Sequence, residues 1–118
     1  MNEAEIKEYV DEEKALERIR KNTKLFKTLL KSFVGTTPDQ MAQLKKEIEA
    51  GDRAAAAKSV HTIKGVAANL SMPKLYELSP QFEALLKGDG SCAEMMANYG
   101  AVYDKTIEVV NILMEKYA

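Results

Sequence analysis

Apolar residues recur at steps of three and four along nearly the whole chain, and no segment alternates apolar and polar residues as a β-strand does. The segment Asp11–Val34 shows this pattern most clearly, and its periodic positions are Leu16, Ile19, Thr23, Phe26, Leu30 and Phe33. In an α-helix such steps bring the side chains onto one stripe that faces a core. The chain is therefore expected to be all-α, built from amphipathic helices.

Breaker and capping residues divide the chain into five predicted helices. In order, the predicted segments are Asp11–Val34, Thr37–Gly51, Asp52–Leu70, Ser71–Leu86 and Ser91–Tyr117. Gly35 and Gly51 are expected to end the first two helices, because a helix C-terminus favours glycine. Thr37 and Ser91 each begin a capping-box pattern, and Pro80 is expected to kink the fourth helix.

The connections between these helices are short, which favours antiparallel neighbours. We therefore predict an antiparallel up-down four-helix bundle with an additional N-terminal helix. A length of 118 residues suits one domain spanning residues 1–118.

Composition excludes several classes of function. The 17 basic and 18 acidic residues leave a net charge of −1, which argues against a nucleic-acid-binding protein. One cysteine, Cys92, allows no internal disulfide and suits a reducing compartment. No apolar run is long enough to cross a membrane, and the acidic N-terminus does not resemble a signal peptide. We therefore expect a cytoplasmic protein with no membrane partner. A monomer is expected because it needs no special assumption.

The third predicted helix carries the only histidine of the chain, His61. At 100° per residue its apolar positions share one arc, and these are Ala56, Val60, Ile63, Ala67 and Leu70. His61 points about 140° away from the centre of that arc. The residues around it on the exposed side are small, namely Ala54, Ala57, Gly65 and Ala68, with Lys58 and Lys64 flanking them. Exposed helix positions normally carry long polar side chains. Because they are missing here, a bulky partner has room to reach the imidazole.

The charges around the histidine have one sign in the sequence. Between Arg53 and Tyr76 the chain has four basic residues and no acidic residue. This distribution predicts a positive potential around His61 that attracts a phosphoryl group or an acidic partner. An unperturbed imidazole has a pKa of about 6.5 and is a competent nucleophile near neutral pH.

The run His61-Thr62-Ile63-Lys64-Gly65 resembles the H-x-x-K-G signature of the histidine-containing phosphotransfer (HPt) domains of bacterial phosphorelays. The resemblance implies that His61 is the phosphoacceptor, that Lys64 supports the phosphoryl group, and that Gly65 gives the partner access. It implies a response-regulator receiver domain or a sensor histidine kinase as partner. The Mg²⁺ ion would belong to the receiver, and this chain would need no cofactor or metal. The sequence departs from the family at Ser71, where many members have glycine, and at Pro80.

The phosphotransfer partner is expected to dock on the small-residue face of the third helix, at Ala54, Ala57, Lys58 and Ala68. Three other kinds of function can be compared with phosphotransfer on the residues present. In a pure interaction module, the alanine-glycine groove on the third helix would instead receive a partner helix without any phosphorylation. A metal-binding bundle would need several inward-facing ligands, and a self-sufficient enzyme would need a phosphate loop or a catalytic set. Neither is present in the sequence. The phosphoacceptor domain of a chemotaxis-type kinase also fits the motif.

Overall fold

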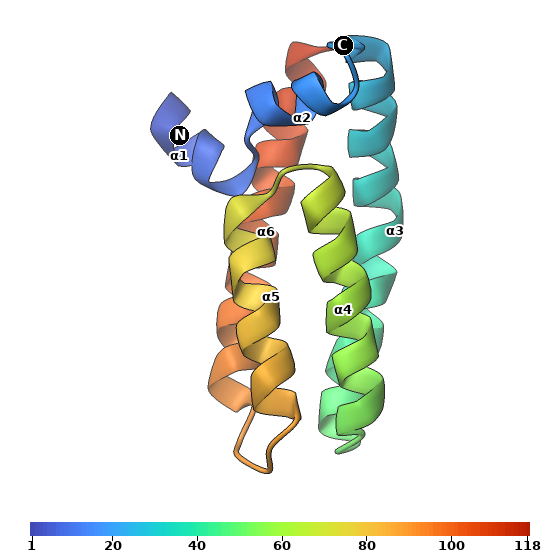
Figure 1. Cartoon of the computed structure of the whole chain (residues 1–118), viewed down its shortest axis with the longest axis vertical. Coiled ribbons are helices and arrows are strands. Elements are labelled where there is room, and N and C mark those ends of the chain that lie inside the picture. Colours follow the sequence, from blue (N-terminus) through green and yellow to red (C-terminus); the bar gives the residue numbers. More distant parts are fainter.

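The computed structural model describes residues 1–118 and contains six helices and no strand. The helices are α1 (Glu3–Tyr9), α2 (Glu12–Arg18), α3 (Thr23–Glu49), α4 (Arg53–Asn69), α5 (Pro73–Leu86) and α6 (Ala93–Lys116). Helices α3 to α6 form an antiparallel up-down bundle in which each helix packs against the next and α6 returns to α3 (Figure 1). The predicted fold is confirmed, and the additional N-terminal part consists of two short helices.

The core lies between the four long helices. Its largest fully buried side chains include Phe26, Phe33, Phe82 and Tyr99. The arc predicted for the third helix is buried as expected, since its five members are between 0% and 4% exposed. The face of α4 that carries His61 is turned away from this arc.

The predicted first helix, Asp11–Val34, is wrong in one respect, because it is interrupted between α2 and α3. Arg20 and Lys21 have φ angles of 55° and 60°, in the left-handed region that ends a helix. Asn22 then caps α3, and its side chain accepts a hydrogen bond from the Leu25 N–H at 3.0 Å. Asparagine is among the best residues at this position, and here it starts a new helix. As a result Thr23 is exposed instead of facing the core.

The predicted helix end at Gly35 and the cap at Thr37 are also wrong, since α3 continues through both residues. Thr37 is fully buried, and its hydroxyl donates to the Phe33 carbonyl at 2.6 Å. Pro38 removes one backbone hydrogen bond, which typically costs about 3 kcal/mol inside a helix. It lies on the exposed side of α3. We attribute the continuity to burial along the whole inner face of α3, which outweighs the local signals.

The remaining helix starts follow the prediction in part. The Asp52 side chain caps α4 by accepting from the Ala55 N–H at 3.1 Å. The capping box at Ser91 is wrong, because α6 begins after Cys92 without a side-chain cap. Ser71 has a φ of 53°, a conformation that favours glycine, which explains why glycine suits this turn.

Pro80 lies inside α5, where the predicted kink stays a prediction.

Two buried hydroxyl pairs join α6 to its neighbours. The hydroxyl of Tyr103 lies 2.8 Å from that of Thr37 on α3, and the hydroxyl of Tyr99 lies 2.8 Å from that of Ser79 on α5. Ser79 also donates to the Leu75 carbonyl at 2.8 Å. Each pair satisfies polar groups that would otherwise be unpaired in the core, so each favours one alignment of α6.

Candidate functional site

His61 lies near the middle of α4, and its side chain is 73% exposed. The neighbouring positions Val60 and Ile63 are fully buried, so the backbone that carries the imidazole is fixed by the core. A rigid helix therefore presents an exposed nitrogen nucleophile to solvent.

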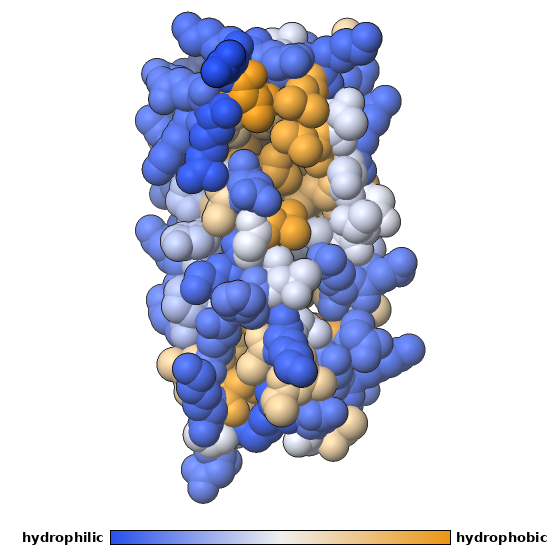
Figure 2. Space-filling model, turned by 45° about the vertical axis from the view of Figure 1, so that its right-hand side comes forward, coloured by the Kyte–Doolittle hydropathy of each residue, from blue (hydrophilic) through white to orange (hydrophobic).

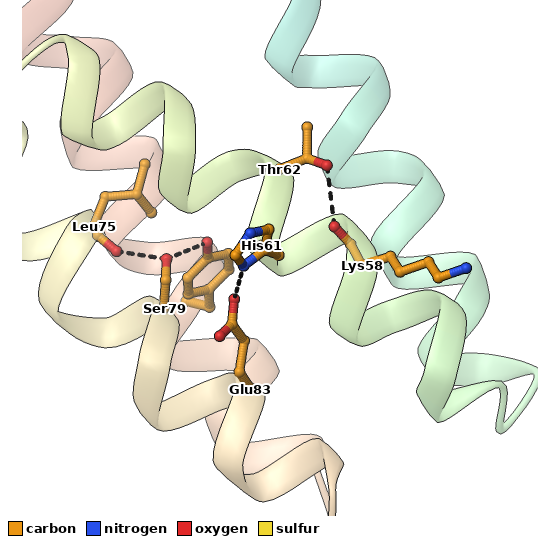
Figure 3. A network of polar contacts seen from close by, with 7 residues as sticks. Lys58, His61, Thr62, Leu75, Ser79 and Glu83 are labelled. Atoms are coloured by element: carbon orange, nitrogen blue, oxygen red, sulfur yellow. Dashed lines mark hydrogen bonds and ion pairs between the residues drawn. The ribbon is translucent and has the colours of Figure 1, made fainter.

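A carboxylate from α5 contacts this imidazole (Figure 3). The Nδ1 atom of His61 lies 3.2 Å from Oε1 of Glu83, whose side chain is only 19% exposed. With the ring proton on Nδ1, this nitrogen donates to Glu83 and the lone pair of Nε2 stays free. No other side chain forms a hydrogen bond with the ring, so Nε2 is open to a reactant.

Lys64 and Gly65 follow one turn along α4. The Lys64 ammonium lies 6.0 Å from the centroid of the Tyr76 ring and forms no ion pair. Gly65 is exposed, and a Cβ atom added there would meet nothing within 4 Å. The space beside the imidazole on this side is therefore open.

The remaining predicted contact residues lie along the same helix with different exposure. Ala54 and Lys58 are exposed, whereas Ala57 and Ala68 are half-buried. The carbonyl of Ala68 accepts a hydrogen bond from Arg18 of α2 at 2.6 Å, so the N-terminal helices reach this end of the surface. The structure thus brings the small residues together around His61, with α2 bordering them at Ala68.

Residues 28–112 match the family model of the Hpt domain. The chain belongs to the Hpt domain family. No curated protein and no solved structure gives a match. Hpt domains are phosphocarrier modules of two-component phosphorelays, and they interact with receiver domains and kinases.

The electrostatic surroundings of His61 in this Hpt domain differ from the sequence prediction. The acid-free stretch of sequence does not produce an acid-free surface, because α5 brings Glu83 beside the ring. The guanidinium of Arg53 is also unavailable to the site. It donates to three backbone carbonyls at the end of α5 and in the following loop, at 2.7–3.1 Å. The predicted positive potential around His61 therefore does not allow for the negative charge of Glu83 beside the ring.

Sequence reasoning missed the two residues that α5 contributes to the site, Glu83 and Tyr76. They are two helical turns apart and therefore share one face of α5. The spacing of the two residues can be read from the sequence. Their position beside His61 depends on how α5 is aligned against α4, which the sequence does not show.

Two features are absent from the structure, a cluster of metal ligands and a helix able to span a membrane. Nowhere do three or more His, Cys, Asp or Glu side chains gather closely enough to hold a metal ion. None of the helices combines the length and the apolar character that crossing a membrane requires.

Proposed function

We propose that this chain accepts a phosphoryl group on Nε2 of His61 from an aspartyl phosphate of a receiver domain and relays it to a response regulator. The observation that supports this most directly is the exposed imidazole whose Nδ1 is held by Glu83, which leaves Nε2 unpartnered. A histidine kinase could also act as the donor, since Hpt domains interact with kinases.

The transfer is an in-line displacement at phosphorus. The lone pair of Nε2 attacks the phosphorus atom, an N–P bond forms, and the bond between the phosphorus and the aspartate oxygen breaks. The aspartate leaves as a carboxylate with the electron pair, and the ring proton stays on Nδ1. Transfer to the next receiver reverses these steps. Catalysis by this chain consists of positioning and charge stabilisation.

The neighbours of His61 have separate roles in this step. Glu83 keeps the proton on Nδ1 and stabilises the positive charge that the ring acquires when Nε2 is phosphorylated. The Lys64 ammonium can turn towards the phosphoryl oxygens, because no carboxylate neutralises it. The receiver supplies the Mg²⁺ ion and the acidic groups, and Gly65 leaves room for them.

The receiver would dock on the small-residue surface of α4 and on apolar surface next to it. Figure 2 shows an apolar area towards one end of the bundle. At the end where α3 begins and α4 finishes, Leu25 is 40% exposed, and Leu29 and Val66 are partly buried. A receiver that covers His61 and extends towards this end of the bundle would bury apolar surface there, as the central parts of protein interfaces do.

Phosphotransfer to wild type and to His61→Gln, measured side by side with phosphorylated receiver domains and Mg²⁺, tests the proposal. Wild type should gain an acid-labile, alkali-stable label, and the variant should gain none. Thermal unfolding of the two proteins should be nearly equal, because the replaced side chain is exposed.

Labelling of the His61→Gln variant would show that another residue is the phosphoacceptor. If a panel of receivers and histidine kinases labels neither protein, while both remain folded, a helix-binding interaction module becomes the better description. Labelling by a kinase domain alone would favour the phosphoacceptor domain of a chemotaxis-type kinase.

A further inference from the structure

The Lys64 ammonium forms one specific contact in the structure, a cation–π contact with the ring of Tyr76. Its Nζ atom lies 6.0 Å from the ring centroid, near the outer limit of a cation–π contact. Lys64 takes part in no ion pair. Tyr76 is 43% exposed, and its hydroxyl forms no hydrogen bond in the structure. Neither residue is thus held by another polar contact.

The antiparallel packing of α4 and α5 places this contact on the side of Lys64 that faces away from Glu83. Along α4 the order is His61, Lys64, Ala68; along α5, which runs in the opposite direction, Glu83 meets His61 and Tyr76 meets Lys64. Tyr76 also lines, together with Ala68, a hollow of about 360 Å³ between α2, α4 and α5. The ring therefore lies at the far end of the small-residue surface from the carboxylate.

This placement matters because an ammonium one turn from His61 would otherwise tend to pair with the carboxylate beside it. Such a pair would take Glu83 away from Nδ1 and neutralise the charge meant for the phosphoryl group. A contact with an aromatic face leaves the ammonium charged, and at an exposed site it is weak enough to be released.

We propose that Tyr76 is a positioning residue for Lys64. Its ring holds the ammonium close to His61 but away from Glu83 until the phosphoryl group arrives. This role rests on the proposed function, since it concerns the same transfer to His61.

The test compares Tyr76→Phe, which keeps the ring, with Tyr76→Leu, which keeps an apolar side chain without a ring. Potassium phosphoramidate serves as a partner-free donor: Nε2 forms the N–P bond, and ammonia leaves. The Phe variant should be labelled at the wild-type rate, and the Leu variant about two- to fivefold more slowly. In a Lys64→Met background the two substitutions should have the same rate.

Proton NMR gives a second reading that does not depend on phosphorylation. The ring should shift the ε-methylene resonances of Lys64 upfield in wild type and Tyr76→Phe, and the shift should be lost in Tyr76→Leu. Equal labelling rates of the Phe and Leu variants, or no upfield shift in wild type, would overturn the role of Tyr76 alone. Absence of any label on His61 in wild type would overturn the proposed function, and this role with it.

Discussion

Among the polar side-chain pairs that join the helices of this Hpt domain, the buried and the exposed ones differ in their access to water. The pairs Tyr99–Ser79 and Tyr103–Thr37 are buried, with their hydroxyl oxygens 2.8 Å apart. The pair His61–Glu83 is at the surface, with a longer separation of 3.2 Å and an imidazole that is 73% exposed.

This difference in exposure suggests that the buried pairs contribute mainly to stability and the surface pair mainly to reactivity. A buried pair must stay formed, because an unpaired polar group in the core costs about 1–3 kcal/mol. A surface pair can open and exchange partners with water at little cost, so it can change as a phosphoryl group is gained and lost. Substitutions in the two sets should therefore affect different measurements.

Loss of the Glu83 carboxylate should give the largest effect among the neighbours of His61. Glu83→Ala should slow labelling by phosphoramidate about tenfold, because a hydrogen bond to a charged group contributes about 1.5 kcal/mol or more. Glu83→Gln keeps an acceptor for Nδ1 without the charge and should be intermediate. Labelling rates and urea unfolding measured on the same samples check this, and stability should change little.

The matched control is Glu77→Ala, which removes an exposed carboxylate from the same helix without touching His61. It should label like wild type. A wild-type rate for Glu83→Ala would show that the surface pair does not contribute to the transfer.

Removal of a buried hydroxyl should change stability. Tyr99→Phe leaves Ser79 without its donor and should lower the free energy of unfolding by about 1 kcal/mol. Burial, as the largest cause, raises the pKa of Tyr99 to about 12. Above pH 10 the unfolded chain therefore loses a proton that the folded chain keeps, and stability falls as pH rises from about 10 to 12. Urea unfolding across this range should show a shallower fall for the variant.

Tyr9→Phe is the control, because the Tyr9 hydroxyl forms no hydrogen bond in the structure. Equal stability of Tyr99→Phe and wild type, at neutral pH and at pH 11, would mean that the buried pairs contribute no more than the surface pair.

The smallest expected effect comes from two glycines inside helices. Gly65 in α4 and Gly100 in α6 both have open space where a Cβ atom would lie. Each change to alanine should raise the free energy of unfolding by about 0.5–1 kcal/mol. Only Gly65→Ala should slow transfer from a receiver domain, since it alone lies beside His61. Equal transfer rates for the two variants would show that the partner does not approach over Gly65.

The fold could largely be predicted because helical periodicity is a local property. The buried arc of α4 and the cap at Asp52 depend on residues within a few turns of each other, and the structure confirms both. The continuity of α3 could not be predicted in this way. Local signals at Gly35 and Pro38 indicate a break, and only packing along the whole inner face overrides them.

The candidate site likewise has one part that could be predicted from the sequence and one part that could not. His61, Lys64 and Gly65 lie within two turns of one helix, so the sequence alone determined their spacing and their common exposed side. Glu83 and Tyr76 reach the same place from α5, and only the tertiary structure decided that they do. The physical reason is that a helix fixes its own periodicity, whereas the alignment of two helices depends on how their side chains pack against each other.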